Sequence, residues 1–195
     1  MKLKKVLALS QMALILGGLM LFAARATAFA GSYTSAGTSY TVGMGVDDYT
    51  DLSSLATYTG KGPGGQYAGQ GISAFAPVGG TGCFLDPSQQ AGCPIDGRAD
   101  GCLYEAVGGA SQNTYEGPFD IETFVRVPGM ASTVCIDFST GAPPYNTVGT
   151  TVDQRTGGTG RFAGKKGTVT TLVHGQMMTM DSKGYGFSWY RGVGN

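Results

Sequence analysis

The stretch Phe119-Asp120-Ile121-Glu122-Thr123-Phe124-Val125-Arg126-Val127 alternates between two kinds of side chain. Its odd-numbered positions are apolar or threonine, and its even-numbered positions carry Asp, Glu, Phe and Arg. A period of two is that of a β-strand with one buried face. We therefore expect a half-buried strand here, with Ile121, Thr123 and Val125 packed in the core.

The opposite face of this strand carries side chains that could bind a ligand. Glu122 and Arg126 lie four residues apart on it, with Phe124 between them. The expected orientation leaves all three in solvent. In a barrel with the reverse orientation, the carboxylate, the ring and the guanidinium would face the lumen and could orient a polar group of a bound ligand.

Strand-like patterns recur along the chain and are separated by glycine-rich turns. Ser132 to Thr140 repeats the period of two, and Pro128-Gly129 predicts a hairpin turn between it and the first stretch. Further strands are expected at Gln66 to Val78, Cys102 to Val107, Thr168 to Met180 and Gly184 to Arg191, and one short helical turn at Asp51 to Thr57. Regularly spaced strands with glycine turns predict an all-β sandwich or antiparallel barrel.

The first 30 residues have the composition of a Sec-type signal peptide. Three lysines, an apolar run from Val6 to Ala24, and two overlapping A-x-A sites at Ala26 to Ala30 follow in order. We expect cleavage after Ala28 or Ala30, export to the periplasm or beyond, and no membrane attachment afterwards. A retained anchor is the alternative, which the tandem cleavage sites disfavour. Residues 31 to 195 then form a single domain.

Charge and cysteine content agree with an exported protein. Without the leader the chain keeps 9 basic and 13 acidic residues and has no basic cluster, which argues against nucleic acid as a partner. An even number of cysteines in an oxidising compartment favours two disulfides, with three possible pairings among Cys83, Cys93, Cys102 and Cys135. We expect Cys83 to pair with Cys93 and Cys102 with Cys135. Cys83 and Cys93 lie in a loop insert, Gly79 to Gly101, that has no strand period.

Few residue patterns point to catalysis or to a metal. There is no C-x-x-C pair and only one histidine, so we expect no metal site, and no cofactor is indicated. His174 lies in an expected strand, where a packed or rim position is the first interpretation and ligand binding the second. The chain has no G-x-S-x-G element, so a hydrolytic triad has no support.

A glycine-rich element near the C-terminal strands carries a family resemblance. Gly157-Gly158-Thr159-Gly160-Arg161-Phe162-Ala163-Gly164-Lys165-Lys166-Gly167 resembles the G-G-T-G-[RK]-F-x-G-x-x-G element of allene oxide cyclases, dirigent proteins and secreted bacterial proteins with the same barrel. The resemblance implies an eight-stranded, calycin-like barrel and, as in those proteins, an oligomer. It also implies a structural role at the barrel rim for Gly157, Gly158, Gly160, Phe162, Gly164 and Gly167. None of the family's catalytic residues can be placed on this chain.

Two functions from different classes follow. The first is a non-enzymatic secreted barrel that holds a small apolar ligand or takes part in an extracytoplasmic interaction. The second, which the resemblance implies, is a cyclase or isomerase that shapes a reactive apolar substrate in the barrel. The lumen is the discriminating feature: an enzyme of this type needs a cavity with a few convergent polar groups, whereas a packed lumen indicates a structural or interaction role.

Overall fold

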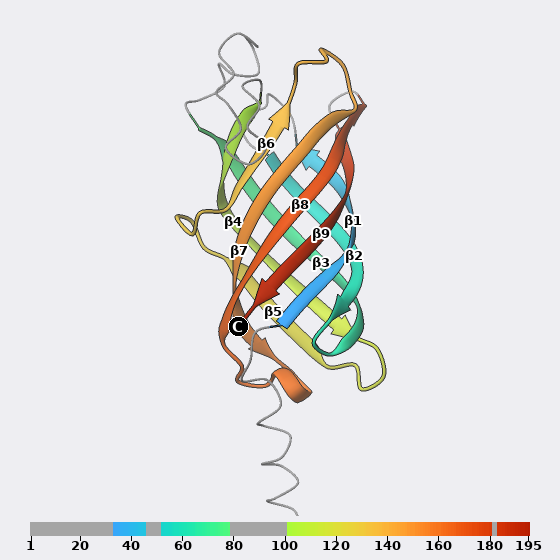
Figure 1. The fold of residues 1–195 in the computed structure, drawn as a ribbon, viewed down its shortest axis with the longest axis vertical. Helices are drawn as coiled ribbons and strands as arrows, with labels where there is room; N and C mark the ends of the chain where they lie inside the picture. Colours follow the sequence, from blue (N-terminus) through green and yellow to red (C-terminus); the bar gives the residue numbers. More distant parts are fainter. Residues whose placement is uncertain (1–32, 46–51, 79–100, 181–182) are drawn as a thin grey trace, which may run out of the picture. The chain divides into compact units, whose positions relative to one another are not determined.

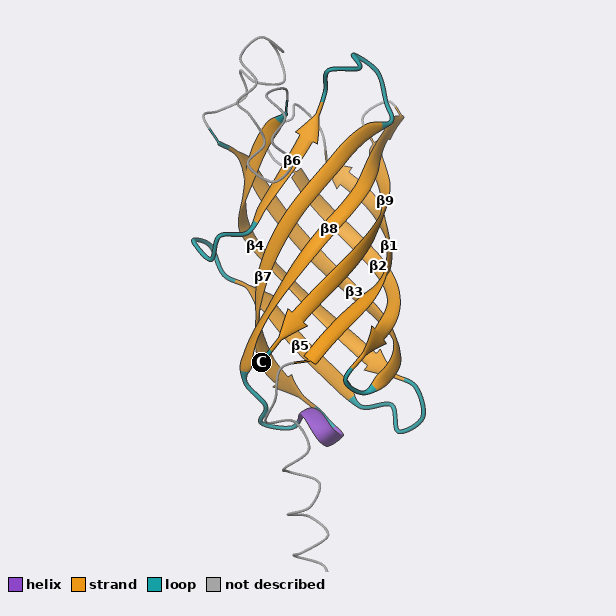
Figure 2. Cartoon of the chain, viewed as in Figure 1, coloured by secondary structure: helices purple, strands orange, loops and turns teal. Residues whose placement is uncertain are grey.

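The computed structural model describes residues 33–45, 52–78, 101–180 and 183–195, which form nine strands (Figure 1). They are β1 Tyr33–Gly45, β2 Leu52–Gly62, β3 Gly65–Pro77, β4 Cys102–Tyr115, β5 Ile121–Arg126, β6 Thr133–Asp137, β7 Tyr145–Gly158, β8 Gly167–Met180 and β9 Lys183–Gly194. Within these ranges the 3-10 turn Gly160–Phe162 is the helical content (Figure 2), and no helix there is long and apolar enough to cross a membrane. β2 replaces the short helical turn expected at Asp51 to Thr57.

The strands close into an antiparallel barrel. Each is hydrogen-bonded to a neighbour on both sides, and the pairing of β1 with β9 joins the two ends of the sheet. β5 and β6 both lie between β4 and β7, so nine strands fill eight positions. The expected all-β barrel of about eight antiparallel strands is confirmed.

β5 and β6 do not form the predicted hairpin. Both are antiparallel to β4, so they run in the same direction, one after the other. The residues between them leave the wall as a loop (Figure 2). Ser132 bridges the gap: its carbonyl accepts a hydrogen bond from Ala106 N (2.9 Å), and its hydroxyl oxygen accepts one from Val152 N (2.7 Å). Pro128-Gly129 therefore interrupts one strand position instead of reversing the chain.

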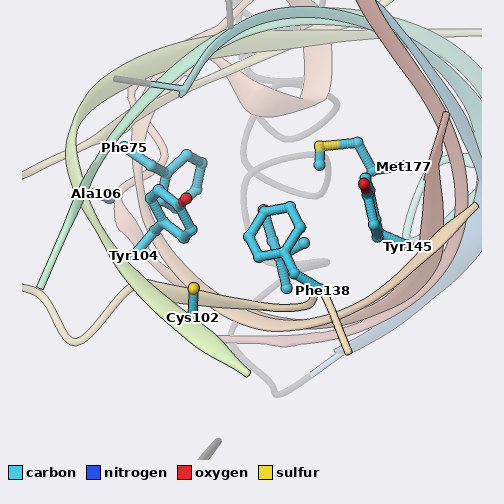
Figure 3. Packing of buried hydrophobic residues seen from close by; sticks show 8 residues of the cluster. Phe75, Cys102, Tyr104, Ala106, Phe138, Tyr145 and Met177 are labelled. Carbon is cyan, nitrogen blue, oxygen red and sulfur yellow. The ribbon is translucent and has the colours of Figure 1, made fainter. Parts of the chain in front are cut away.

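Two clusters of buried side chains occupy the two ends of the barrel. The first, which we call the floor, contains Tyr67, Tyr115 and Phe162, with Tyr58 and Tyr190 against it. The second, the upper cluster, contains Phe75, Cys102, Tyr104, Ala106, Ile136, Phe138, Tyr145 and Met177. Figure 3 shows Phe138 in the middle of the upper cluster, between Tyr104 and Tyr145. Its ring packs edge-on against Tyr145, with centroids 4.8 Å apart.

The glycine-rich element forms the connection between β7 and β8 at the floor end of the barrel. Phe162, in its 3-10 turn, is 2% exposed and stacks on Tyr115 with centroids 4.8 Å apart. Thr159 N donates to Ile121 O (2.8 Å) and Ile121 N donates to Thr159 Oγ1 (2.9 Å), which fastens the connection to β5. The element is thus a barrel-rim hairpin, as expected for a structural role.

Gly158 and Gly160 of this element lie too close to neighbouring atoms to carry a side chain. Gly158 has φ +147°, and a Cβ there would meet the carbonyl oxygen of Ile121. Gly160 has φ +53°, and a Cβ there would meet the Asp120 carboxylate. That carboxylate accepts from Arg161 Nε (2.6 Å), an ion pair that requires the turn to approach this closely.

The cysteines Cys102 and Cys135 do not pair with each other. Cys102 lies opposite Ile136 and Cys135 lies opposite Leu103, so their side chains leave opposite faces of the sheet. The expected Cys102–Cys135 bond is therefore wrong, although neither residue is a free cysteine. Cys83 and Cys93, and with them the expected Cys83–Cys93 bond, lie outside the described residues, as do most of the 79–101 insert and the leader 1–30. The signal peptide stays a prediction.

Substituting Gly158 should destabilise the barrel more than substituting another positive-φ glycine whose Cβ would lie in open space. We expect Gly117→Ala (φ +87°, no atom within 4 Å of its Cβ) to cost about 1 kcal/mol of unfolding free energy through backbone strain alone. Gly158→Ala should cost about 2 kcal/mol more, because the β5–β7 contact must also open. Urea unfolding of both variants measures this, and equal losses would contradict the close approach.

Candidate functional site

A cavity of about 260 Å³ lies in the lumen between the floor and the upper cluster. It exists because four neighbouring strands place small side chains inward: Ser35, Ser39 and Thr41 on β1, Ser54 and Ala56 on β2, Gly71 and Ser73 on β3, and Gly186 and Ser188 on β9. Such side chains cannot reach the centre of an eight-stranded barrel, which larger ones would fill. For comparison, a dry cavity of about 150 Å³ binds benzene.

The opposite wall carries the charges, and β5 is part of it. Glu122 and Phe124 are 1% and 8% exposed, and both line the cavity together with Arg126. The expected orientation of this strand is therefore wrong: Ile121, Thr123 and Val125 form its outer face. The prediction failed because it assumed that charged side chains face solvent, whereas those of this strand face the lumen and form ion pairs there.

Glu122 belongs to a closed network at the floor. Its Oε1 accepts a hydrogen bond from Arg155 Nε (2.7 Å) and its Oε2 accepts one from Tyr115 OH (2.8 Å). Asn113 Nδ2 lies 3.5 Å from the same Oε2, and Arg155 donates through Nη1 to Asn195 O (3.2 Å). The Glu122 and Arg155 side chains are only 1% and 4% exposed. A buried pair with this many partners is a structural tie between β4, β5 and β7.

Arg126 forms a second ion pair one layer above. Its Nε lies 3.0 Å from Asp153 Oδ1, and its Nη2 donates to Asp153 Oδ2 (3.1 Å). Its Nη1 donates to Ser73 Oγ (2.7 Å) on β3, and the guanidinium lies over the Phe75 ring, 5.5 Å from the centroid. The Arg126 and Asp153 side chains are 12% and 14% exposed, and both border the cavity directly. This pair can therefore contact a molecule in the lumen.

The floor of the cavity is a set of neutral tyrosines. Burial raises the pKa of Tyr58 to about 12. Burial also raises the pKa of Tyr67, Tyr115 and Tyr190, and the nearby Glu122 charge adds to the effect at Tyr115. The Tyr67 and Tyr190 hydroxyls are 2.6 Å apart and share a hydrogen bond. These phenols present ring faces and hydroxyl dipoles to the lumen but no charge.

His174 does not join the other expected ligand-binding residues. It lies on the outward face of β8, exposed, opposite Val148 of β7 and Trp189 of β9. Trp189 is 55% exposed and stacks on Phe187 on the same outer surface. The structure brings Glu122, Phe124 and Arg126 together in the lumen and places His174 outside it.

Asp153 and Arg155 are site residues that the sequence analysis missed. Their strand, β7, has threonines and glycines where a hydrophobic alternation would be looked for. The order of acidic and basic residues in the two strands could have revealed them. β5 and β7 each carry an acid followed by a base on one face, and antiparallel pairing of two such strands sets each acid against a base.

The described residues contain no group of three or more His, Cys, Asp or Glu side chains that could hold a metal ion. Comparison with models of protein families, with curated proteins and with solved structures found no match.

The floor tyrosines predict a barrel that unfolds in alkali. Their pKa values are higher in the folded chain than the ordinary value of 10, so above pH 10 the unfolded chain loses protons that the folded chain keeps. The contribution of these tyrosines to the free energy of unfolding is fully present below pH 10 and is lost as the pH rises towards 12. Urea midpoints at pH 8, 10 and 11, with phenolate absorbance, test this. Tyr58→Phe should flatten the decline, and full phenolate formation in a still-folded barrel would refute it.

Proposed function

We propose that this protein is an exported barrel that binds a small, largely apolar molecule in its lumen. The observation that carries the proposal is the cavity of about 260 Å³, bounded by aromatic rings at the floor and by the Arg126–Asp153 pair at its wall. An apolar cavity with a few convergent polar groups is the usual form of a small-molecule site. A packed lumen would instead have favoured a purely structural or interaction role.

The charged groups of the lumen support binding over catalysis. Glu122 is bonded by Arg155 and Tyr115, and Asp153 is bonded by Arg126, with Thr151 Oγ1 3.4 Å away. Each of these carboxylates is already engaged by a guanidinium, which favours a structural or binding role over proton transfer from a substrate. A cyclase or isomerase that only shapes a reactive substrate remains the alternative, and turnover of a captured ligand would distinguish it.

Export is part of the same proposal, and the β4–β6 register changes the disulfides that it implies. Since Cys102 and Cys135 lie on opposite faces of the sheet, their partners would be the two remaining cysteines, Cys83 and Cys93. Two such bonds would each tie the 79–101 insert to the barrel wall, one at β4 and one at β6. Each would stabilise the folded state by about 2–4 kcal/mol.

Filling the cavity should abolish ligand capture. We expect native mass spectrometry of the exported protein, purified without refolding, to show a non-covalent adduct. Ala56→Leu adds an apolar side chain to the cavity wall and should reduce the adduct at least tenfold. Thr57→Leu makes a similar change on the exposed face of the same strand and should leave it unchanged. Absence of any adduct, or equal loss in both variants, would count against lumenal binding.

Peptide mapping without reduction tests the export proposal. The mature chain should begin after Ala28 or Ala30, and Cys102 and Cys135 should each be linked to a cysteine of the insert. Their opposite orientations are the physical reason. The reduced sample is the control. An intact N-terminus, free thiols, or a peptide joining Cys102 to Cys135 would contradict this prediction.

A further inference from the structure

We propose that the lumenal ligand is uncharged and presents an oxygen acceptor to the guanidinium of Arg126, with its apolar body against Phe124 and the floor. This inference rests on the proposed lumenal binding and specifies the chemical class that the cavity selects. It depends on three properties of the described lumen: its charge balance, the donor capacity of Arg126, and the polarity of the facing wall.

The charges that border the cavity are already paired. Glu122 is compensated by Arg155 and Asp153 by Arg126, at nitrogen–oxygen distances of 2.7 and 3.0 Å. A carboxylate ligand could bind Arg126 only by competing with Asp153, which would then be a buried charge without its partner. An ammonium ligand that approached the Asp153 carboxylate would be repelled by the Arg126 guanidinium beside it. A neutral molecule disturbs neither ion pair.

Arg126 keeps donor capacity for such a molecule. A guanidinium has five N–H hydrogens. Among the described residues Nη1 donates one hydrogen to Ser73 and Nη2 donates one to Asp153, and the buried Nε lies 3.0 Å from Asp153 Oδ1. The second hydrogens of Nη1 and Nη2 are therefore the ones that a ligand can reach. The group is also held in place, by two strands and by the Phe75 ring beneath it. A fixed cation with unused N–H hydrogens is a strong donor to a carbonyl, ether or hydroxyl oxygen.

The facing wall offers no competing charge. Its inward residues are serine, threonine, alanine and glycine, and the Ser39 and Ser188 hydroxyls, 2.7 Å apart, bond each other across β1 and β9. The floor phenols are neutral as well. The lumen therefore has one strongly polar point, at Arg126, and an apolar aromatic end. A ligand that is apolar with one acceptor oxygen matches both.

Four probes with one bicyclic skeleton test the inference on the mature protein: 2-acetylnaphthalene, 2-ethylnaphthalene, 2-naphthoate and 2-naphthylmethylamine. Two fused rings fit a cavity of 260 Å³, since about 150 Å³ admits benzene. We expect the ketone to bind best, about tenfold tighter than the ethyl compound for one hydrogen bond to a charged donor. The carboxylate and the ammonium should each bind at least tenfold more weakly than the ketone.

A charge-balanced variant assigns the preference to Arg126. Arg126→Met combined with Asp153→Leu removes both charges and introduces no new hydrogen-bond donor, so the fold keeps no unpaired ion, and the variant should bind the ketone and the ethyl compound equally. Arg191→Met, an exposed change on the outer wall, should keep the tenfold preference. Tightest binding of naphthoate, or a ketone preference that survives in the double variant, overturns the inference while lumenal binding stands. Binding of none of the four probes overturns both.

Discussion

Burial of the Glu122 carboxylate beside the Arg155 guanidinium is the constraint on which the lumen depends. Each charge alone would lose several kcal/mol on leaving water, so neither residue can face inward unless the other does. The pair therefore fixes the inward face of β5 and of β7 together. Because side chains alternate along a strand, Phe124, Arg126 and Asp153 follow into the lumen. The second ion pair and the cavity wall are consequences of the first.

The closed floor and the open centre of the barrel arise from residue size. Tyr115 connects Glu122 to the floor, where its ring stacks on Phe162 of the β7–β8 connection. That connection can approach β5 only because Gly158 and Gly160 lack side chains. Towards the centre, the inward residues of β1, β2 and β9 are too small to meet across the barrel. Large rings at the two ends and small hydroxyls between them leave the space that a ligand can occupy.

The sequence identified strands wherever apolar and polar residues alternate, and failed where the alternation is between small and polar ones. β3, β5, β6, β8 and β9 were located near their true bounds, and β4 in its first half. β1, β2 and β7 were missed, because serine, threonine and glycine give no hydrophobic period. The orientation of β5 was inverted for another reason: ion pairs inside the lumen reverse the rule that charge faces solvent. Arg155 lies on β7, and because that strand was missed, the pairing of Glu122 with Arg155 could not be predicted. The resemblance implied a hairpin at the barrel rim for residues 157–167, and these residues do connect β7 to β8.

Both ion pairs join a carboxylate to a guanidinium, but they differ in their surroundings. This difference gives one pair a structural role and lets the other contact a ligand. Glu122 and Arg155 are bonded on every side by β4, β5, β7 and the last residue of the chain, so the pair has no contact to give to a ligand. Arg126 and Asp153 are bonded to each other and to Ser73 but border the open cavity. Four residues along β5 and two along β7 thus separate a charge that holds the barrel together from a charge that can contact a ligand.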